Sequence, residues 1–254
     1  MDREGIQQEW EQLPSDAEHG ATRERTVAEA TTDETSLILP LNEDQALALL
    51  NRRDLAVETL EQFSQNPAAM KSRKVCVALV THPRTPRHFA LRLLRRLYTF
   101  DLMSLALHPA VAADVKRLAD DQLVARLASV TLGERLTLGR RGSQAVAAAL
   151  LLDKEPRVSH TALENSRLTE GAVIKALLRP NARGAFVEAV CHHAKWSVRR
   201  EICLTLLRSP HTPLASALEF ARALPPPLLR DILHASRLPE KIKTYFRNTL
   251  KERT

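Results

Sequence analysis

The chain has 254 residues, of which 44% are hydrophobic and 4% aromatic, with 7 glycines and a formal net charge of +7. This length accommodates one elongated repeat array or two small domains. Leu and Ala dominate the apolar residues and favour helices, whereas strands prefer β-branched and aromatic residues. The scarcity of glycine argues against a fold built on tight β-hairpins. The composition therefore predicts an all-α protein.

The first 36 residues form an acidic segment with few apolar side chains. Residues 1–40 carry ten acids against three arginines, a net charge of −7, so residues 41–254 carry a net charge of +14. A segment of this composition buries too little apolar surface to offset its ordering entropy. We expect residues 1–36 to be an acidic, disordered tail and residues 37–254 to form one helical-repeat domain.

One apolar triplet interrupts the acidic tail. Ile6, Trp10 and Leu13 are spaced at i, i+4 and i+7, which places them on one face of a helix. Anchors at this spacing are typical of helices that dock into apolar grooves. The triplet is therefore a candidate docking motif, and the alternative is that the tail is an inert leader.

From residue 37 onward, helical periodicity is interrupted only by short breaks that usually contain proline. Examples of these breaks are Pro83–Pro86, Pro210–Pro213 and Pro225–Pro227. Short helices joined by such breaks predict a stack of antiparallel helix pairs. No apolar run approaches the roughly 18 residues that a membrane span needs. The polar N-terminus is unlike a signal peptide, and the three cysteines form no CxxC pair, so we expect a cytoplasmic protein.

The chain contains an internal duplication. Residues 73–123 align with residues 200–250 at a constant offset of 127 without a gap, and thirteen positions are identical, including Cys76/Cys203, Leu79/Leu206 and Thr85/Thr212. Within this offset lies a shorter interval. Four threonines with helix-start chemistry follow one another at spacings of 46, 38 and 43, namely Thr85, Thr131, Thr169 and Thr212. The mean period is about 42 residues.

This period and the recurring turn motif (His82-Pro-Arg-Thr-Pro86, Ser209-Pro-His-Thr-Pro213) resemble HEAT-like helical-repeat proteins, including bacterial variant-repeat proteins. The resemblance covers residues 42–253. It implies a HEAT-like α-solenoid of antiparallel helix pairs. It says little about function, because this architecture hosts scaffolds, nucleic-acid binders and a few enzymes.

No residue cluster has the spacing of a catalytic, cofactor or metal site. Cys191-His192-His193 is the most ligand-like cluster, but adjacent histidines on a helix point about 100° apart, and no second pair follows at zinc-site spacing. There is no nucleophile elbow and no phosphate-binding glycine loop. The sequence predicts no cofactor and favours a non-enzymatic protein.

Basic residues form the other candidate site. His88, Arg92, Arg95 and Arg96 are spaced at i, i+4, i+7 and i+8, and Arg95 aligns with Arg222. The candidate binding stripe consists of His88, Arg92, Arg95, Arg96, Arg199, Arg200 and Arg222. Its alternative is an ordinary solvated helix face.

The sequence is compatible with two functions. The first is an interaction scaffold that binds a protein partner through the repeat surface, with an acidic partner suited to the basic body. The second is binding of nucleic-acid phosphates through a basic face, resembling the HEAT-like DNA glycosylases. Trp196, Tyr98 and Tyr245 are the aromatic residues available for stacking on bases.

Overall fold

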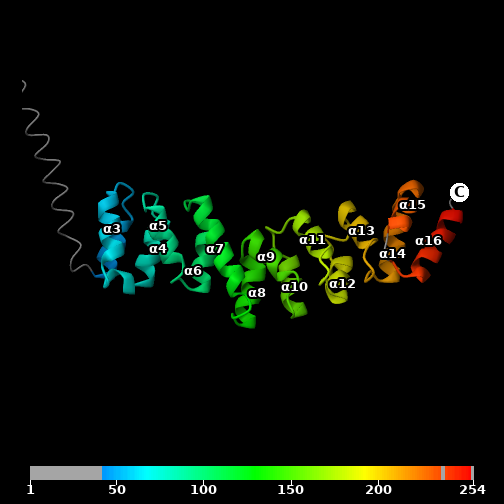
Figure 1. The fold of residues 1–254 in the computed structure, drawn as a ribbon, viewed down its shortest axis with the longest axis horizontal. Helices are drawn as coiled ribbons and strands as arrows, with labels where there is room; N and C mark the ends of the chain where they lie inside the picture. Colours follow the sequence, from blue (N-terminus) through cyan, green and yellow to red (C-terminus); the bar gives the residue numbers. More distant parts are fainter. Residues whose placement is uncertain (1–41, 236–237, 253–254) are drawn as a thin grey trace, which may run out of the picture. The chain divides into compact units, whose positions relative to one another are not determined.

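The computed structural model describes residues 42–235 and 238–252 (Figure 1). Helices account for 67% of these residues, and the described part of the chain contains 15 α-helices and no β-strand. The all-α prediction is therefore confirmed. The acidic tail and the triplet Ile6, Trp10 and Leu13 lie outside the described residues.

The described residues divide into two compact units, unit 1 up to Ala90 and unit 2 from Leu91 onward. In unit 1, α2 (Glu43–Leu50) packs against α4 (Arg73–Thr81). In the sequence, α3 (Val57–Gln65) and a short 3₁₀ helix, η1 (Ala69–Lys71), lie between α2 and α4. The unit ends within α5 (Arg87–Leu94). The core of unit 1 includes the fully buried side chains of Leu60, Phe63 and Leu79.

Unit 2 contains the remaining helices. They are α6 (Thr99–Leu107), α7 (Ala113–Arg126), α8 (Leu132–Arg141), α9 (Gln144–Leu150), α10 (Pro156–Leu163), α11 (Glu170–Leu177), α12 (Gly184–His192), α13 (Arg200–Leu206), α14 (Leu214–Arg222), α15 (Pro226–Ala235) and α16 (Glu240–Glu252). α8 packs against α10 and α10 against α12, while α7 packs against α9, α9 against α11 and α11 against α13. From α7 to α13 the helices therefore form two rows, with odd-numbered helices in one and even-numbered helices in the other (Figure 1).

Side-chain caps explain where several helices begin. The side chains of Asn42, Ser72, Thr131 and Ser143 each accept an N–H from the first turn of the helix that follows. Such caps satisfy backbone donors that have no partner inside the helix. Thr131 and Glu134 form the predicted capping box, with the Glu134 carboxylate 2.9 Å from the Thr131 nitrogen.

The expectation that Thr85 and Thr212 cap the following helices is wrong. Their hydroxyls instead donate backwards, Thr85 to the carbonyl of Leu79 at 2.5 Å and Thr212 to that of Leu206 at 2.6 Å. The N-cap of α14 is Pro213, which makes no side-chain cap. Each threonine therefore closes the end of the preceding helix, where carbonyl groups lack intrahelical partners.

The helix starts follow the offset of the internal duplication over a longer stretch than the aligned sequence. The first six described α-helices begin at residues 43, 57, 73, 87, 99 and 113, and α11 to α16 begin at residues 170, 184, 200, 214, 226 and 240. Each helix in the second series starts 127 residues after its counterpart in the first series, which is the offset of the aligned sequences. Leu79 and Leu206 are both buried, as expected. Cys76 and Cys203 each donate S–H to the carbonyl six residues earlier, although Cys76 is buried and Cys203 only partly so.

The number of helices differs from the expected pairs. Three α-helices begin between residue 43 and the start of α5 at residue 87, and three more before the start of α8 at residue 132. Some of the additional breaks carry no proline, for example the break at Ser143 between α8 and α9 and residues 193–199 between α12 and α13. The proline pattern therefore undercounted the helices.

Candidate functional site

The basic stripe is not one helical face. α5 ends at Leu94, so His88 and Arg92 lie on the helix while Arg95 and Arg96 lie in the turn that follows it. The Arg95 carbonyl accepts a hydrogen bond from the Arg126 guanidinium at 3.0 Å, and the Leu97 carbonyl accepts another at 2.7 Å. Arg95 and Arg96 are therefore not on the same helical face as His88 and Arg92, because the helix ends before them.

The other predicted basic residues lie on two further helices. Arg199 is the N-cap of α13, Arg200 is its first residue, and Arg222 is the last residue of α14. All seven side chains of the predicted stripe are exposed. The structure thus distributes them over the ends of three helices and their turns.

Cys191, His192 and His193 are held in structural roles. Cys191 is buried, and this burial raises the pKa of its thiol to about 11, against a smaller lowering by a hydrogen bond with Ser216. His193 Nδ1 accepts the N–H of Lys195 at 3.1 Å. His192 Nδ1 lies 2.9 Å from the carbonyl oxygen of Glu188. No cluster of three potential metal ligands occurs in the described part of the chain.

Trp196 is not available for stacking on bases. Its side chain is only 2% exposed, and its indole N–H donates to the Leu163 carbonyl at 2.8 Å. Tyr98 and Tyr245 are exposed, as are several apolar side chains, of which Leu178 and Val198 are the most accessible. The tryptophan that the sequence offered as a surface residue is therefore part of the core.

A cleft of about 380 Å³ lies between the C-terminal ends of α11 and α13. We call it the Arg208 cleft; its lining residues are Leu177, Leu178, Arg179, Pro180, Ala182, Thr205, Arg208, Ser209, Pro210 and His211. Arg179, Arg208 and His211 supply positive or titratable groups, and no acid lines the cleft. Leu178, 66% exposed, contributes an apolar patch. Neither arginine makes a side-chain hydrogen bond or ion pair within the described residues of unit 2.

The corresponding junction of α2 and α4 in unit 1 is closed by two side chains. His82 Nε2 lies 2.9 Å from the Arg52 carbonyl oxygen, and His82 is buried. The Arg84 guanidinium donates to the carbonyls of Asp54 at 3.0 Å and Leu55 at 3.2 Å. These side chains connect the turn after α4 to the turn after α2.

The junction of α8 and α10 is closed in the same manner. The Asn165 side-chain amide donates to the carbonyls of Gly139 at 2.7 Å and Gly142 at 3.2 Å, and Asn165 is completely buried. Arg167 adds a longer bond to the Arg141 carbonyl at 3.4 Å. A polar side chain after one helix thus satisfies carbonyls at the end of the helix two positions earlier.

The α11–α13 junction lacks this closure. At the offset of the duplication, Ser209 stands in the place of His82 and His211 in the place of Arg84. Within the described residues of unit 2, neither side chain bonds to the turn after α11; the Ser209 hydroxyl instead accepts the His211 N–H at 3.4 Å. Serine is too short to reach across, so the junction stays open as the Arg208 cleft.

Comparison with protein families, with curated proteins and with solved structures finds no match to this chain. None of the helices described is both long and apolar enough to cross a lipid bilayer. The Arg208 cleft was not among the residues predicted from the sequence. The alignment of the two copies nevertheless contained an indication of it. On either side of the identical pair Pro83/Pro210, the second copy has Ser209 and His211 in place of the bridging residues His82 and Arg84.

Proposed function

We propose that this chain is a non-enzymatic helical-repeat protein, an α-solenoid, that binds an acidic segment of a partner protein through the Arg208 cleft. The recurrence of helix starts at the offset of the internal duplication supports the repeat. The contacts between second neighbours from α7 to α13 also support it, since stacked repeats contact only their neighbours.

The repeating unit in this proposal contains three helices in about 42 residues. Its first helices are α2, α5, α8, α11 and α14, which begin at residues 43, 87, 132, 170 and 214. The third helix of a group packs on the first in α2–α4, α8–α10, α11–α13 and α14–α16. The junctions of the first three groups carry a bridging side chain at their C-terminal ends, namely His82, Arg126 and Asn165.

The observation that carries the function is the open junction of the fourth group. Two arginines that have no ionic partner among the described residues line a cleft that contains no acid, beside an exposed leucine. Guanidinium groups bind carboxylates through paired, charge-assisted hydrogen bonds. Leu178 adds an apolar contact that a phosphate backbone would not use. An acidic segment with an apolar residue therefore suits the cleft better than a nucleic acid does.

The test compares two charge reversals in the full chain. Binding of a labelled peptide of alternating Glu and Leu is measured for wild type, for the double variant Arg179→Glu/Arg208→Glu, and for Arg92→Glu/Arg96→Glu, which changes the net charge equally. We expect the cleft variant to lose affinity by about tenfold or more, because two charge-assisted hydrogen bonds are removed. The control should lose much less.

Two results would contradict the proposal. Equal losses in both variants would indicate general attraction between the basic body and the acidic peptide. Binding of random duplex DNA that falls steeply with salt, and that neither reversal of the cleft arginines nor excess peptide affects, would favour the nucleic-acid alternative. Circular dichroism of both variants checks that the helices are retained.

A further inference from the structure

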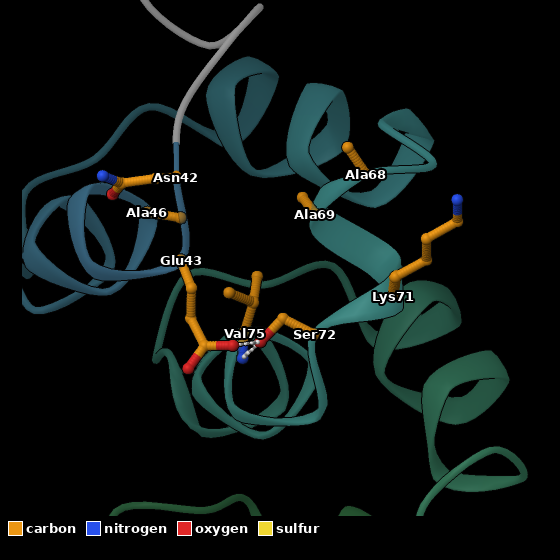
Figure 2. Close-up of a pocket in the computed structure, with 8 residues that line it drawn as sticks. All are labelled: Asn42, Glu43, Ala46, Ala68, Ala69, Lys71, Ser72 and Val75. Carbon is orange, nitrogen blue, oxygen red and sulfur yellow. Dashed lines mark hydrogen bonds between the residues drawn. The ribbon is translucent and has the colours of Figure 1, made fainter.

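Unit 1 contains an open pocket where the α11–α13 region has a buried tryptophan. The pocket, of about 330 Å³, lies between the N-terminal ends of α2 and α4 and beside η1. We call it the Ala69 pocket. Figure 2 shows Ala46 on α2 and Ala69 on η1 lining it from two sides, with Glu43 reaching across to Ser72. Val75 and Ala46 are buried beneath it.

The turn that carries Ala69 has the same hydrogen bonds as the turn that carries Trp196, its counterpart in the duplication. Asn66 Oδ1 accepts the N–H of Ala68 at 2.9 Å, and His193 Nδ1 accepts the N–H of Lys195 at 3.1 Å. The Ser72 N–H donates to the Ala69 carbonyl, and the Arg199 N–H donates to the Trp196 carbonyl, both at 3.1 Å. The two turns therefore place Ala69 and Trp196 equivalently.

Three of the residues that line this pocket are smaller than their counterparts in the duplication. Ala69 stands for Trp196, Ala46 for Val173, and Val75 for Ile202. Trp196, Val173 and Ile202 are all buried. Loss of an indole and several methyl groups at equivalent positions leaves a space that a tryptophan side chain suits, since interiors pack to nearly crystalline density.

The chain itself supplies such a side chain. It has 2 tryptophans, Trp196 and Trp10. The N-terminal segment joins the described structure at Asn42, which lines the pocket. Trp10 precedes Asn42 by 32 residues, and an unconstrained segment of that length spans about 30 Å. The acids Glu9 and Glu11 flank Trp10, and the exposed ammonium of Lys71 lies at the rim of the pocket.

We propose that the Ala69 pocket receives the indole of Trp10 from this chain's own N-terminal segment. The tethered side chain reaches the pocket at an effective concentration of about millimolar, so even a weak contact is occupied. In the sequence, Ile6 and Leu13 flank Trp10 at helical spacing. This inference is independent of the Arg208 cleft.

Fluorescence of the full chain tests the inference. In a Trp196→Phe variant, Trp10 is the only tryptophan, so its emission and its quenching by acrylamide report its burial. We expect blue-shifted emission and weak quenching. Adding Ala69→Phe, which fills the pocket, should shift the emission to the red and raise quenching several-fold. Adding Ala48→Phe, at an exposed position of α2 outside the pocket, should leave both unchanged.

If Trp196→Phe unfolds the protein, the difference between the spectra of wild type and Trp10→Phe isolates the same signal in the intact fold. Red-shifted, readily quenched Trp10 emission would overturn the inference. So would blue-shifted emission that Ala69→Phe does not change, because the indole would then be buried elsewhere. Emission that shifts with protein concentration would assign the pocket to the tail of a second copy and overturn the intramolecular contact.

Discussion

The α2–α4 and α11–α13 regions have corresponding helix starts in the internal duplication but open to solvent at opposite ends. Trp196, in the turn before α13, is buried and donates to the carbonyl at the end of α10, while its counterpart Ala69 lines the Ala69 pocket in unit 1. At the C-terminal ends, His82 and Arg84 close the junction of α2 and α4, while Ser209 and His211 leave the Arg208 cleft. A few side chains at corresponding positions thus decide which end of each region is open to solvent.

The largest expected effect comes from removing the buried tryptophan that precedes α13. Trp196→Ala deletes a buried indole and leaves the Leu163 carbonyl without its donor. We expect the free energy of unfolding to fall by about 3–5 kcal/mol, as for other large-to-small core substitutions. Urea denaturation followed by circular dichroism measures this. Val198→Ala, at a neighbouring side chain that is 75% exposed, is the control and should change stability by less than about 0.5 kcal/mol. Similar losses in the two variants would show that Trp196 does not fill a structural space.

The second prediction exchanges the residues that close one junction and leave the other open. The double variant His82→Ser/Arg84→His gives unit 1 the side chains of the open junction. It removes the bonds to the carbonyls of Arg52, Asp54 and Leu55. We expect the free energy of unfolding to fall by about 1–3 kcal/mol, measured by urea denaturation, because the buried histidine is removed and these carbonyls lose their side-chain partners.

The reciprocal variant, Ser209→His/His211→Arg, should fold at least as well as wild type. It should also weaken binding of the acidic peptide, because the new side chains would occupy the Arg208 cleft. Unchanged affinity in this variant would show that the open junction is not the binding surface.

The sequence predicted the helical class and the positions of many helix ends, because Leu and Ala periodicity and Thr131 capping are local properties. It misplaced the roles of Thr85 and Thr212, whose hydroxyls have two possible partners, the following N–H groups or the preceding carbonyls. Only the path of the turn decides between them. The placement of Arg95 and Arg96 was also wrong, because their apolar and basic spacing continues past Leu94, where the helix ends.

The site was harder to predict than the fold because it is defined by missing contacts. From the sequence, Trp196 was an aromatic residue available for stacking on bases. The structure buries it, and its indole donates to Leu163, which is 33 residues away in the sequence. The Arg208 cleft exists because Ser209 does not reach the turn after α11. An unmade hydrogen bond has no local pattern, and only comparison of the two copies makes it visible.

A third prediction concerns what the two regions share. Thr85→Val and Thr212→Val each remove a hydroxyl that donates to a helix-end carbonyl, Leu79 or Leu206. Each should lower the free energy of unfolding by about 0.5–1.5 kcal/mol, and urea denaturation should give similar values for both. Thr244→Val, whose exposed hydroxyl donates to Glu240 within α16, is the control and should cost less. A large effect at only one of Thr85 and Thr212 would mean that the two helix ends are not equivalent.

The smallest expected effect distinguishes the two regions by charge at the rim of the Ala69 pocket. Glu43 pairs with Lys74 at 2.8 Å and accepts the Ser72 hydroxyl at 2.8 Å, whereas Glu170 and Glu201 at the corresponding positions are both acids. The hydrogen bonds from Lys74 and Ser72 lower the pKa of Glu43 from its usual value. Because the folded-state pKa is lowered, the pair stabilises the fold above the unfolded pKa, and this contribution is lost as the pH falls through the folded value.

The Glu43→Gln variant should therefore have a slightly lower melting temperature than wild type near neutral pH and the same melting temperature in strongly acidic buffer. The Glu170→Gln control should show no such convergence, since that carboxylate has no basic partner at the position of Lys74. Exposed pairs are screened by salt, so the difference near neutral pH should shrink at high ionic strength; a difference that persists in acid would have to come from something other than the ion pair.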